Sequence, residues 1–271
     1  MAKKARVDEM TVQQGLADDL ETARKLIMSG EIRTKDRLWD KAGEKIPVET
    51  ILEHKPRHCK WVSMGGLKLE KALKDFSVSP QNLRCLDIGA STGGFTDVLL
   101  SKGAKEVVAL DVGRQLLDPK IQNNPRVIIK DKTNFKTMDT SEFSEPFDLI
   151  VTDVSFISLE HILPKASKIL TKEGAIIALI KPQFEAEKHL VPEGGIIIDP
   201  NVQTDVINKL KNLFINDGLY LWGLTPVPLV SKRKNIEFVS YWKLLLAPDG
   251  AEPNIEQTVS DAHKANAISP S

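Results

Sequence analysis

A strand, a glycine turn and the start of a helix are predicted within one short segment, Leu83 to Thr96. It reads Leu-Arg-Cys-Leu-Asp-Ile-Gly-Ala-Ser-Thr-Gly-Gly-Phe-Thr. Its first six residues are mostly apolar and predict a buried strand. Gly89, Gly93 and Gly94 then predict a tight turn, and Phe95–Ser101 predicts an amphipathic helix. Backbone N–H groups and a helix N-terminus would converge on one point, because a glycine has no Cβ to hold a ligand away. The segment therefore predicts a site for a nucleotide-like ligand.

Acidic residues stand at two successive strand ends around this turn. Asp87 lies near the end of the first strand, and Glu106–Asp111 predicts a second strand that ends in a carboxylate. Such a carboxylate can accept hydrogen bonds from two ribose hydroxyls. The dinucleotide pattern G-x-G-x-x-G is not matched, because Ser91 replaces its second glycine. A tight turn without a ligand remains the alternative.

The pattern Asp-x-Gly-x-x-x-Gly-Gly, with the acid before the first glycine, resembles the S-adenosylmethionine (SAM) site of methyltransferases. The resemblance implies SAM as the cofactor, bound at the carboxyl edge of the sheet. The residues that we expect to bind it are Asp87, Gly89, Ala90, Ser91, Gly93, Gly94, Phe95, Asp111, Val112 and Asp131.

Composition narrows the class of protein. The 271 residues suggest one large domain, or a small and a medium one, and 41% hydrophobic residues are enough for a core. We expect no membrane-spanning helix, because no run of eighteen apolar residues occurs. The basic N-terminus leads into Asp8 and Glu9 rather than an apolar stretch, so we expect no signal peptide. Cys59 and Cys85 form neither a disulfide framework nor a metal site, which favours a reduced, cytoplasmic chain.

The charge balance excludes a uniformly basic protein. Lysine and arginine number 37, as do aspartate and glutamate, so the formal net charge is zero. This balance argues against a basic coat for nucleic acid but leaves room for a local basic patch.

The first 60 residues predict a small module of their own. Arg6 to Gly30 carries two helical patterns, the second capped by Asp18 or Asp19. Ile32 to Ile46 then predicts a small hairpin of short strands, with turns near Asp36 and Gly43. Glu49 to Lys60 has the composition of a linker, and a helix follows Gly65-Gly66.

From Leu83 onward, strands alternate with helices, which is the signature of a parallel sheet. Leu219–Val230 and Glu237–Leu246 have no helix between them and should pair antiparallel. We therefore expect an α/β fold with a Rossmann-like, mostly parallel sheet of about seven strands and an antiparallel end strand. Residues 248–271 lack apolar periodicity and predict a mobile tail. The expected strands are 84–88, 106–111, 126–130, 147–152 and 174–181, and the expected helices lie near 93–102, 114–121, 158–169 and 200–216.

Three charged residues stand where such a sheet presents a ligand. Asp153 and Lys181 follow two apolar strands, and Glu237 begins the last one. A lysine after six apolar residues must find a carboxylate or lower its pKa, and Asp153 is the obvious partner. A structural ion pair is the alternative explanation for each residue taken alone.

Four separated motifs together resemble a known family. Lys68 in Ser-Met-Gly-Gly-Leu-Lys, Asp153 in Val-Thr-Asp-Val-Ser-Phe, Lys181 in Ile-Lys-Pro-Gln-Phe and Glu237 in Asn-Ile-Glu-Phe match the Lys-Asp-Lys-Glu set of FtsJ-type ribose 2′-O-methyltransferases. The stretch from Arg6 to Ile32 resembles the RNA-binding domain named after ribosomal small-subunit protein four, here called S-four-like. With this domain in front, the chain is identified as a member of the TlyA family, in which many proteins carry the label haemolysin. Met64 stands where the family has arginine.

The resemblance implies a domain order and a function. Residues 1–60 would form an S-four-like RNA-binding domain with linker, residues 61–247 an FtsJ-like, class I SAM-dependent methyltransferase domain, and residues 248–271 the tail. The implied activity is methylation of a ribose 2′-hydroxyl, on cytidine, in ribosomal RNA, with ribosomal RNA or ribosomal subunits rather than DNA or a membrane as partner. The residues that would contact RNA phosphates are Arg6, Arg24, Lys25, Arg33, Lys35 and Arg37.

Chemistry gives each member of the four-residue set a role. Methyl transfer from a sulfonium needs the 2′-oxygen aligned behind the methyl group and its proton removed. Lys181 could accept that proton, Asp153 would orient Lys181, and Lys68 and Glu237 would hold the ribose. Three other readings stay open: a non-catalytic ribosome-associated RNA-binding protein, a membrane-active haemolysin and an NAD(P)-dependent oxidoreductase.

Overall fold

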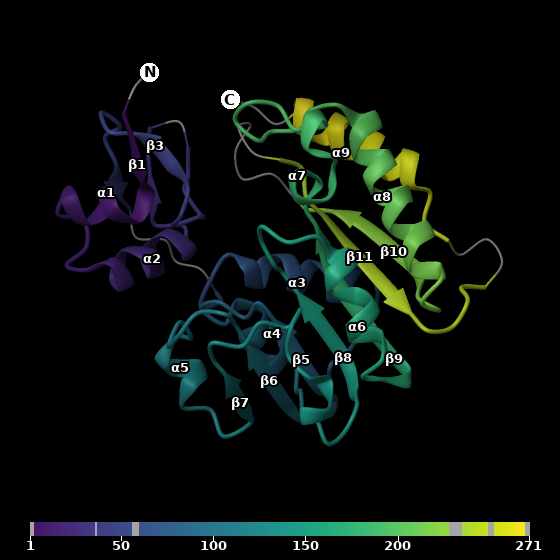
Figure 1. Ribbon diagram of the computed structural model, residues 1–271. Coiled ribbons are helices and arrows are strands. Elements are labelled where there is room, and N and C mark those ends of the chain that lie inside the picture. Colours follow the sequence, from purple (N-terminus) through teal and green to yellow (C-terminus); the bar gives the residue numbers. More distant parts are fainter. Residues whose placement is uncertain (1–2, 36, 56–59, 228–234, 249–251, 269–271) are drawn as a thin grey trace.

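The chain forms two lobes, a small one coloured purple in Figure 1 and a larger α/β lobe. This computed structural model describes residues 3–35, 37–55, 60–227, 235–248 and 252–268. Cys59, the turn expected near Asp36 and the end of the strand expected up to Val230 lie outside these ranges. None of the helices in the described ranges is long and apolar enough to span a membrane.

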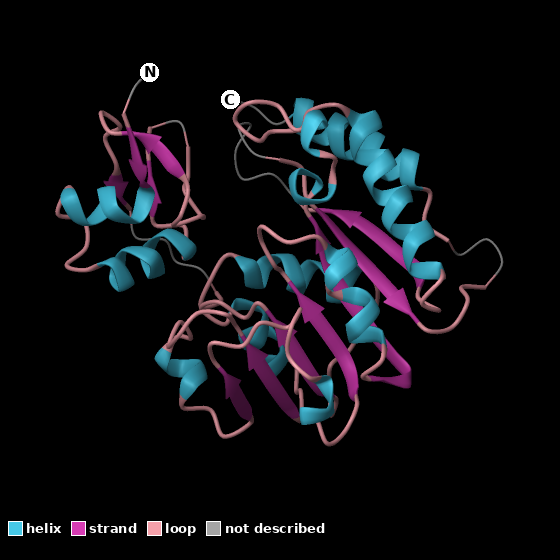
Figure 2. Cartoon of the chain, viewed as in Figure 1, coloured by secondary structure: helices cyan, strands magenta, loops and turns pink. Residues whose placement is uncertain are grey.

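One seven-stranded sheet organises the larger lobe (Figure 2), in the order β10-β11-β9-β8-β5-β6-β7. The chain runs from β5 outward through β6 and β7, and then returns to build the other half from β8. The crevice beside β5 and β8 is thus the topological switch point, where open α/β sheets bind ligands. The strands are β5 (Arg84–Ile88), β6 (Glu106–Leu110), β7 (Val127–Lys130), β8 (Phe147–Thr152), β9 (Leu170–Ile180), β10 (Tyr220–Pro226) and β11 (Phe238–Lys243).

The direction of the strands confirms the predicted fold class. β5 to β9 pair in parallel, whereas β11, the last strand in the chain, pairs antiparallel with both β9 and β10. The reversed strand lies second from the edge, with β10 outside it. The connection from Pro226 to Phe238 is too short for the crossover of roughly a dozen or more residues that parallel pairing needs, so the two strands pair antiparallel.

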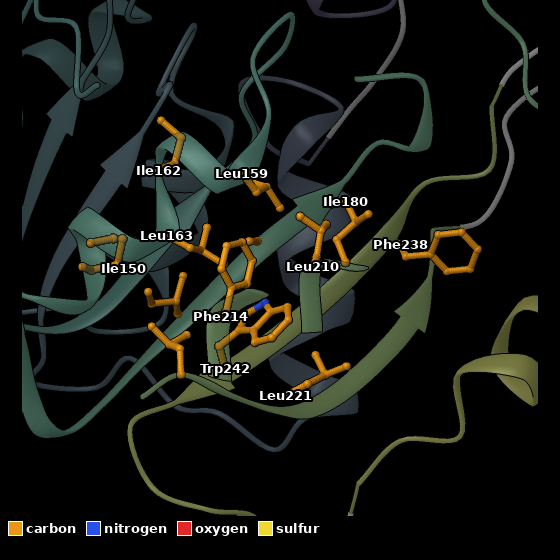
Figure 3. Packing of buried hydrophobic residues seen from close by; sticks show 14 of the residues in the cluster. Ile150, Leu159, Ile162, Leu163, Ile180, Leu210, Phe214, Leu221, Phe238 and Trp242 are labelled. Atoms are coloured by element: carbon orange, nitrogen blue, oxygen red, sulfur yellow. The ribbon is translucent and has the colours of Figure 1, made fainter. Parts of the chain in front are cut away.

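Helices cover both faces of the sheet, so its central strands are apolar on both sides. In β9, Ile176, Ala178 and Ile180 face one core, and Ile177 and Leu179 face the other. Figure 3 shows the first core, where the Phe214 ring packs edge-on against Trp242 at 5.2 Å between centroids. The helices over this core are α6 (Leu163–Ser167), α8 (Pro200–Ile215) and α9 (Ile255–Ile268), and those over the other face include α3 (Gly65–Asp75), α4 (Gly94–Ser101) and α5 (Pro119–Gln122).

The expectation that Phe95–Ser101 forms an amphipathic helix is wrong in one respect. The helix α4 exists, but every residue from Gly94 to Leu100 is buried, because the sheet and α3 enclose it from two sides. Its one charged residue, Asp97, accepts hydrogen bonds from the Val62 N–H at 3.1 Å and the Lys120 ammonium at 2.8 Å. These partners remove the cost of burying a carboxylate.

Two other helices are shorter than predicted. The helix expected over 114–121 is the single turn α5, which begins at Pro119 behind the cap of Asp118. The helix expected over 158–169 is split into a 3-10 turn and α6, which has Pro164 in its first turn. Proline lacks an N–H and is tolerated in the first turn of a helix, which is where Pro119 of α5 and Pro164 of α6 lie.

The small lobe has the two predicted helices, but its strands pair differently. The sequence predicted one hairpin within Ile32–Ile46; instead β3 pairs with β1 and β2 pairs with β4, each antiparallel. β4 lies in the segment predicted as a linker, and β1 was not predicted. The elements are β1 (Lys4–Arg6), α1 (Val7–Gln13), α2 (Leu20–Met28), β2 (Ile32–Arg33), β3 (Lys45–Pro47) and β4 (Glu53–His54), around a core of Val7, Met10, Ile27, Ile32, Trp39, Ile46 and Leu52.

The prediction of a mobile tail at residues 248–271 is wrong for Ile255–Ile268, and residues 249–251 and 269–271 lie outside the described ranges. Ile255–Ile268 forms the helix α9, and Figure 1 shows it in yellow alongside α8. Ile255, Val259 and Ala262 are buried against the core that contains Phe214. Their spacing of four and three residues is that of a helix. Three apolar residues among polar ones are nevertheless too few to predict a helix from the sequence, when the core that they cover is not known.

Replacing Ile255 by alanine is therefore expected to lower the free energy of unfolding by about 2–5 kcal/mol, because it leaves a cavity under α9. Urea-induced unfolding of both proteins measures this difference. The neighbouring substitution Glu256→Ala, on the exposed side of α9, should change stability by less than about 0.5 kcal/mol. Equal stability of the Ile255→Ala variant and the unaltered protein would mean that α9 does not cover the core in solution.

Candidate methyl-transfer site

Topology brings the predicted site residues to one edge of the sheet. Asp153 directly follows β8 and Lys181 directly follows β9, so both stand at carboxyl ends of neighbouring parallel strands. Glu237 directly precedes β11, whose first residue, Phe238, pairs with Ile180. Because β11 runs antiparallel, its beginning lies beside the end of β9. A strand start and two strand ends therefore meet at one place.

Four charged side chains form a continuous chain of ion pairs there. The Lys181 ammonium lies 2.5 Å from Asp153 Oδ1, and the Lys68 ammonium lies 3.3 Å from Asp153 Oδ2. Lys68 also donates a hydrogen bond to Glu237 Oε2 at 2.7 Å. Lys68 reaches the site from the first turns of α3. The order is thus Lys181, Asp153, Lys68, Glu237, with alternating charge and a net charge of zero.

The charge states of the two central members are fixed by their neighbours. Burial alone would lower the pKa of Lys68, but the charges of Asp153 and Glu237 outweigh it and raise that pKa well above its ordinary value. Burial would raise the pKa of Asp153, but Lys181 and Lys68 hold it far below its ordinary value. Lys68 therefore stays protonated and Asp153 ionised at neutral pH, and neither can take up a proton from a substrate.

Ser155 is a site residue that the sequence analysis missed. Its hydroxyl accepts a hydrogen bond from the Lys181 ammonium at 2.9 Å. The side chain of Lys181 is almost fully buried, so its direction is set by Asp153 on one side and Ser155 on the other. The signal was present in the sequence, since Ser155 lies two residues after Asp153 in the same strand-end loop.

The glycine turn has the conformation that the sequence predicts. Gly89 and Gly93 have φ angles of 82° and 92°, in the left-handed region that favours glycine. Gly94 begins α4, and a Cβ there would overlap the Ser63 hydroxyl. The segment Ser63–Gly66 therefore packs directly against the backbone of the turn at Gly94.

Asp111 stands at the end of β6, facing this turn. Its carboxylate accepts hydrogen bonds from the Ser91 N–H at 2.8 Å and the Gly113 N–H at 2.7 Å. Two backbone donors hold the carboxylate in place and leave further lone pairs on both oxygens, which is the arrangement needed to accept two ribose hydroxyls.

Asp87 is the most buried acid of the site, at 1% exposure. Burial raises its pKa to about 7, with the charges of Asp111 and Asp153 adding to the effect and the hydrogen bond from Thr96 opposing it. The Thr96 hydroxyl donates that bond to Asp87 Oδ2 at 2.7 Å. A carboxyl that titrates near neutrality is unusual, and it makes stability depend on pH.

We expect Asp87→Asn to become more stable relative to the unaltered protein as pH rises. An unfolded aspartate loses its proton near its ordinary pKa of 3.8, whereas folded Asp87 keeps it to about pH 7. Within this window the folded state binds more protons, so the stability of the unaltered protein falls with rising pH, by at most about 4 kcal/mol across the window. Urea unfolding of both proteins at pH 5 and pH 8 measures the difference, and pH profiles that run parallel would contradict the assignment.

These groups line one cavity of about 580 Å³. It contains the four-residue set and every predicted cofactor residue except Gly93 and Asp131. Gly93 and Asp131 are not part of this lining: Gly93, which precedes α4, faces Ile121, and the Asp131 carboxylate accepts a hydrogen bond from the Gln115 N–H at 2.7 Å. The sequence analysis missed the loop after β7, which adds Thr133, Asn134 and Phe135 to the lining.

The small lobe also contributes to the cavity wall. Met28 and the segment Asp40–Gly43 line it together with residues of the larger lobe. Met28 Sδ accepts a hydrogen bond from the Ser91 hydroxyl at 2.9 Å. Met64, where the family has arginine, lies against Gly30 of the small lobe, since a Cβ on Gly30 would stand 3.1 Å from Met64 Cγ.

Most of the basic residues predicted to bind RNA are engaged in ion pairs. Arg6 and Arg24 both bind the fully buried Asp8, at 2.7 and 3.0 Å. The others form pairs within the small lobe, Lys25 with Glu21 and Arg37 with Glu44. Arg33 and Lys35 have no ion-pair partner among the residues that the structure describes. Periodicity and charge counts could not reveal this pairing, because it depends on the tertiary fold.

An exposed aromatic ring stands at the rim of the cavity. Phe156 is 75% exposed, has a φ of 66°, and its ring centroid lies 5.0 Å from that of Phe184. A positive φ is strained for a bulky residue, and such strain concentrates at functional sites.

Comparison with known proteins agrees with this geometry. A family model described as FtsJ-like methyltransferase matches residues 61–244. YqxC of Bacillus subtilis is 39% identical over 270 residues, which cover 97% of this chain and 95% of that protein. The 16S/23S rRNA (cytidine-2′-O)-methyltransferase TlyA of Mycobacterium tuberculosis is 34% identical over 266 residues, covering 96% and 99%. A solved structure from Streptococcus thermophilus that carries a hemolysin name has a TM-score of 0.74 at 37% identity, covering 98% of each chain.

The similarity extends over nearly the whole length of these proteins, and it confirms the resemblance that the sequence motifs indicate. The chain belongs to the FtsJ-like methyltransferase family, in the group that includes TlyA.

Proposed function

We propose that this protein transfers the methyl group of SAM to the 2′-hydroxyl of a cytidine ribose in ribosomal RNA. The observation that carries the proposal is the chain of ion pairs from Lys181 through Asp153 and Lys68 to Glu237, which lies in the same cavity as the glycine turn. Family membership supports a methyltransferase, and TlyA is named for this reaction on ribosomal RNA. Because the proposed substrate is the RNA of ribosomal subunits, we propose that the protein acts in the cytoplasm.

The cavity fits SAM. Asp111 would accept hydrogen bonds from the two ribose hydroxyls of SAM, because its carboxylate is already held by backbone donors. Gly89 would let the amino acid part of SAM approach the backbone, because a Cβ there would stand against Val154 at the cavity wall. Bound SAM supplies an electrophilic methyl group on a sulfonium, and the residues of this chain must do the rest.

Lys181 is the proposed general base. Lys68 and Asp153 are fixed in charge by their neighbours, and the Glu237 carboxylate accepts a hydrogen bond from Lys68, so we assign acceptance of the 2′-hydroxyl proton to Lys181. Asp153 and Ser155 direct its amine, and Lys68 and Glu237 would position the ribose through the donor and acceptor that they offer. Phe156 would hold the base by stacking, because single-stranded bases stack on exposed aromatic rings.

The small lobe is proposed to be an S-four-like RNA-binding domain, with Arg33 and Lys35 as its phosphate contacts. Both lack an ion-pair partner in the described ranges, so their charges are available to RNA. Replacing both by alanine should make binding to ribosomal subunits weaker and flatten its salt dependence, with the log–log slope falling by about 1.4 for two lost contacts. A filter-binding series from low to high salt measures the slope. Identical slopes for both proteins would exclude these residues as anchors.

Mapping of ribose methylation tests the function as a whole. Ribosomal RNA from cells that lack this gene should miss a 2′-O-methyl group that returns when the gene is restored. The same RNA, purified as subunits, should accept labelled methyl groups from SAM when the protein is added. A gene carrying Lys181→Ala is the matched control and should not restore the mark. Identical methylation maps with and without the gene would refute the proposal.

A further inference from the structure

Lys41 of the small lobe lies in the methyl-transfer cavity. It belongs to the loop between β2 and β3, more than a hundred residues before Asp153 in the sequence. It nevertheless lines the same cavity as Lys68, Lys181 and Glu237. The sequence analysis did not select it, since it is one of many lysines in a polar loop.

Lys41 forms no ion pair with any residue that the structure describes, although Asp40, Glu44 and Glu237 act on it at longer range. The ammonium lies 4.9 Å from the centroid of the Phe184 ring, three residues after Lys181. Burial lowers the pKa of Lys41, and the charge of Glu237 opposes this while that of Lys181 adds to it. No carboxylate lies within 4 Å of the ammonium in the described part of the chain. Among the described residues the ammonium therefore contacts an aromatic ring and no carboxylate, which leaves N–H donors for a ligand.

Other cations of the small lobe contrast with this arrangement. Arg6, Arg24, Lys25 and Arg37 are each paired with a carboxylate of the same lobe. Lys41 instead adds a positive charge to a set of four residues whose charges already cancel. Asp40, which precedes Lys41, also lines the cavity and balances its charge, so Lys41 does not give the cavity a net positive charge. It gives the small-lobe side of the cavity an ammonium group that can donate to an anion bound beside the target ribose.

We propose that Lys41 is a positioning residue that binds the RNA phosphate next to the target ribose, so that the small lobe completes the methyl-transfer site. The proposal rests on the proposed function. A ribose in RNA is always flanked by phosphates, and a lysine that holds one of them fixes the 2′-oxygen relative to Lys181. Lys41 neither gives nor takes a proton in this role. Its contribution is the alignment on which in-line displacement depends.

The carboxylate of SAM is the other anion that could reach Lys41, and the test separates the two. The full chain is compared with Lys41→Ala, Lys41→Arg and the control Lys172→Ala, which removes an exposed lysine near the opposite end of β9. The probes are SAM in calorimetry and ribosomal subunits from cells that lack this gene, in salt-dependent binding and in methyl transfer.

We expect Lys41→Ala to leave SAM affinity within twofold of the unaltered protein. Its slope of log affinity for subunits against log salt should be shallower by about 0.7, the value of one lost phosphate contact. The kcat/KM for methyl transfer should fall about tenfold or more, as for a lost charge-assisted hydrogen bond, and Lys41→Arg should restore most of it. Lys172→Ala should match the unaltered protein in methyl transfer and in SAM affinity.

Three results would overturn the proposal. A large loss of SAM affinity in Lys41→Ala would assign Lys41 to the cofactor carboxylate. An unchanged salt slope would make it a clasp between the lobes through Phe184, and a kcat/KM equal to that of Lys172→Ala would make it irrelevant to the reaction. If the proposed function itself is wrong, the unaltered protein will transfer no methyl group to the subunits. The slope of log affinity against log salt would in that case still show whether Lys41 contacts a phosphate.

Discussion

Replacing Lys181 by arginine is expected to remove most methyl transfer while leaving SAM binding intact. Arginine keeps the positive charge beside Asp153, but it cannot lose a proton near neutral pH. If general-base catalysis contributes about a hundredfold, the barrier rises by at least about 2.7 kcal/mol. Single-turnover transfer of labelled methyl to ribosomal subunits, with saturating protein and SAM, measures this loss apart from product release. Lys181→Ala should lose at least as much.

The competing explanation is that Lys181 only neutralises Asp153. On that explanation Lys181→Arg would largely keep its activity, and so would the double variant Lys181→Ala with Asp153→Ala in a folded protein. A Lys181→Arg enzyme with near-normal turnover would therefore refute the base assignment but not the methyltransferase function. Calorimetry with SAM on the same samples shows whether any loss is one of chemistry rather than of cofactor binding.

Replacing Gly89 by valine is expected to abolish measurable SAM binding. Gly89 has a φ of 82°, which a β-branched residue adopts only at a cost of about 1–3 kcal/mol. A Cβ would also stand 3.1 Å from Val154 Cγ1 and 3.7 Å from the Asp153 carbonyl oxygen, at the wall of the cavity. Strain together with lost contact with SAM should lower affinity by at least about thirtyfold, or 2 kcal/mol. Calorimetric titration with SAM measures the change.

Gly218→Val is a matched control for this experiment. Gly218 has a φ of 72°, and nothing lies within 4 Å of a Cβ built on it. The control therefore carries similar backbone strain in the turn after α8, away from the cavity. It should lose stability but bind SAM normally, and both variants should still unfold cooperatively. Normal SAM affinity in Gly89→Val, or tighter binding of NAD than of SAM by the unaltered protein, would contradict the cofactor site.

Local sequence was enough to predict the elements that carry the site. Each central strand is a short apolar run, so the strands at 84–88 and 147–152 could be placed to the residue. The turn needs a positive φ at Gly89, and glycine is the residue type that adopts a positive φ most readily, so this turn could be predicted. Once the strands are known to be parallel, their carboxyl ends must share an edge, which is why Asp153 and Lys181 could be predicted as partners.

The prediction failed where the outcome depends on which distant segment packs against a given one. The short strands of the small lobe pair as β1 with β3 and β2 with β4, and two or three residues carry too little pattern to choose a partner. Likewise, α9 is stabilised by packing over the core around Phe214. Its three buried residues alone do not predict that packing.

The sequence by itself determined the fold class and the glycine turn, because these follow from residue type and spacing within single segments. The set of four charged residues was predicted from the resemblance of separate motifs to FtsJ-type methyltransferases. Only the tertiary structure decided which charges remain available to a substrate. It pairs Arg6 and Arg24 with Asp8, and it places Lys41 in the cavity without a carboxylate partner in the described ranges. An ion pair forms between side chains a few ångströms apart, and that distance is set by the folding of the whole chain rather than by separation along it.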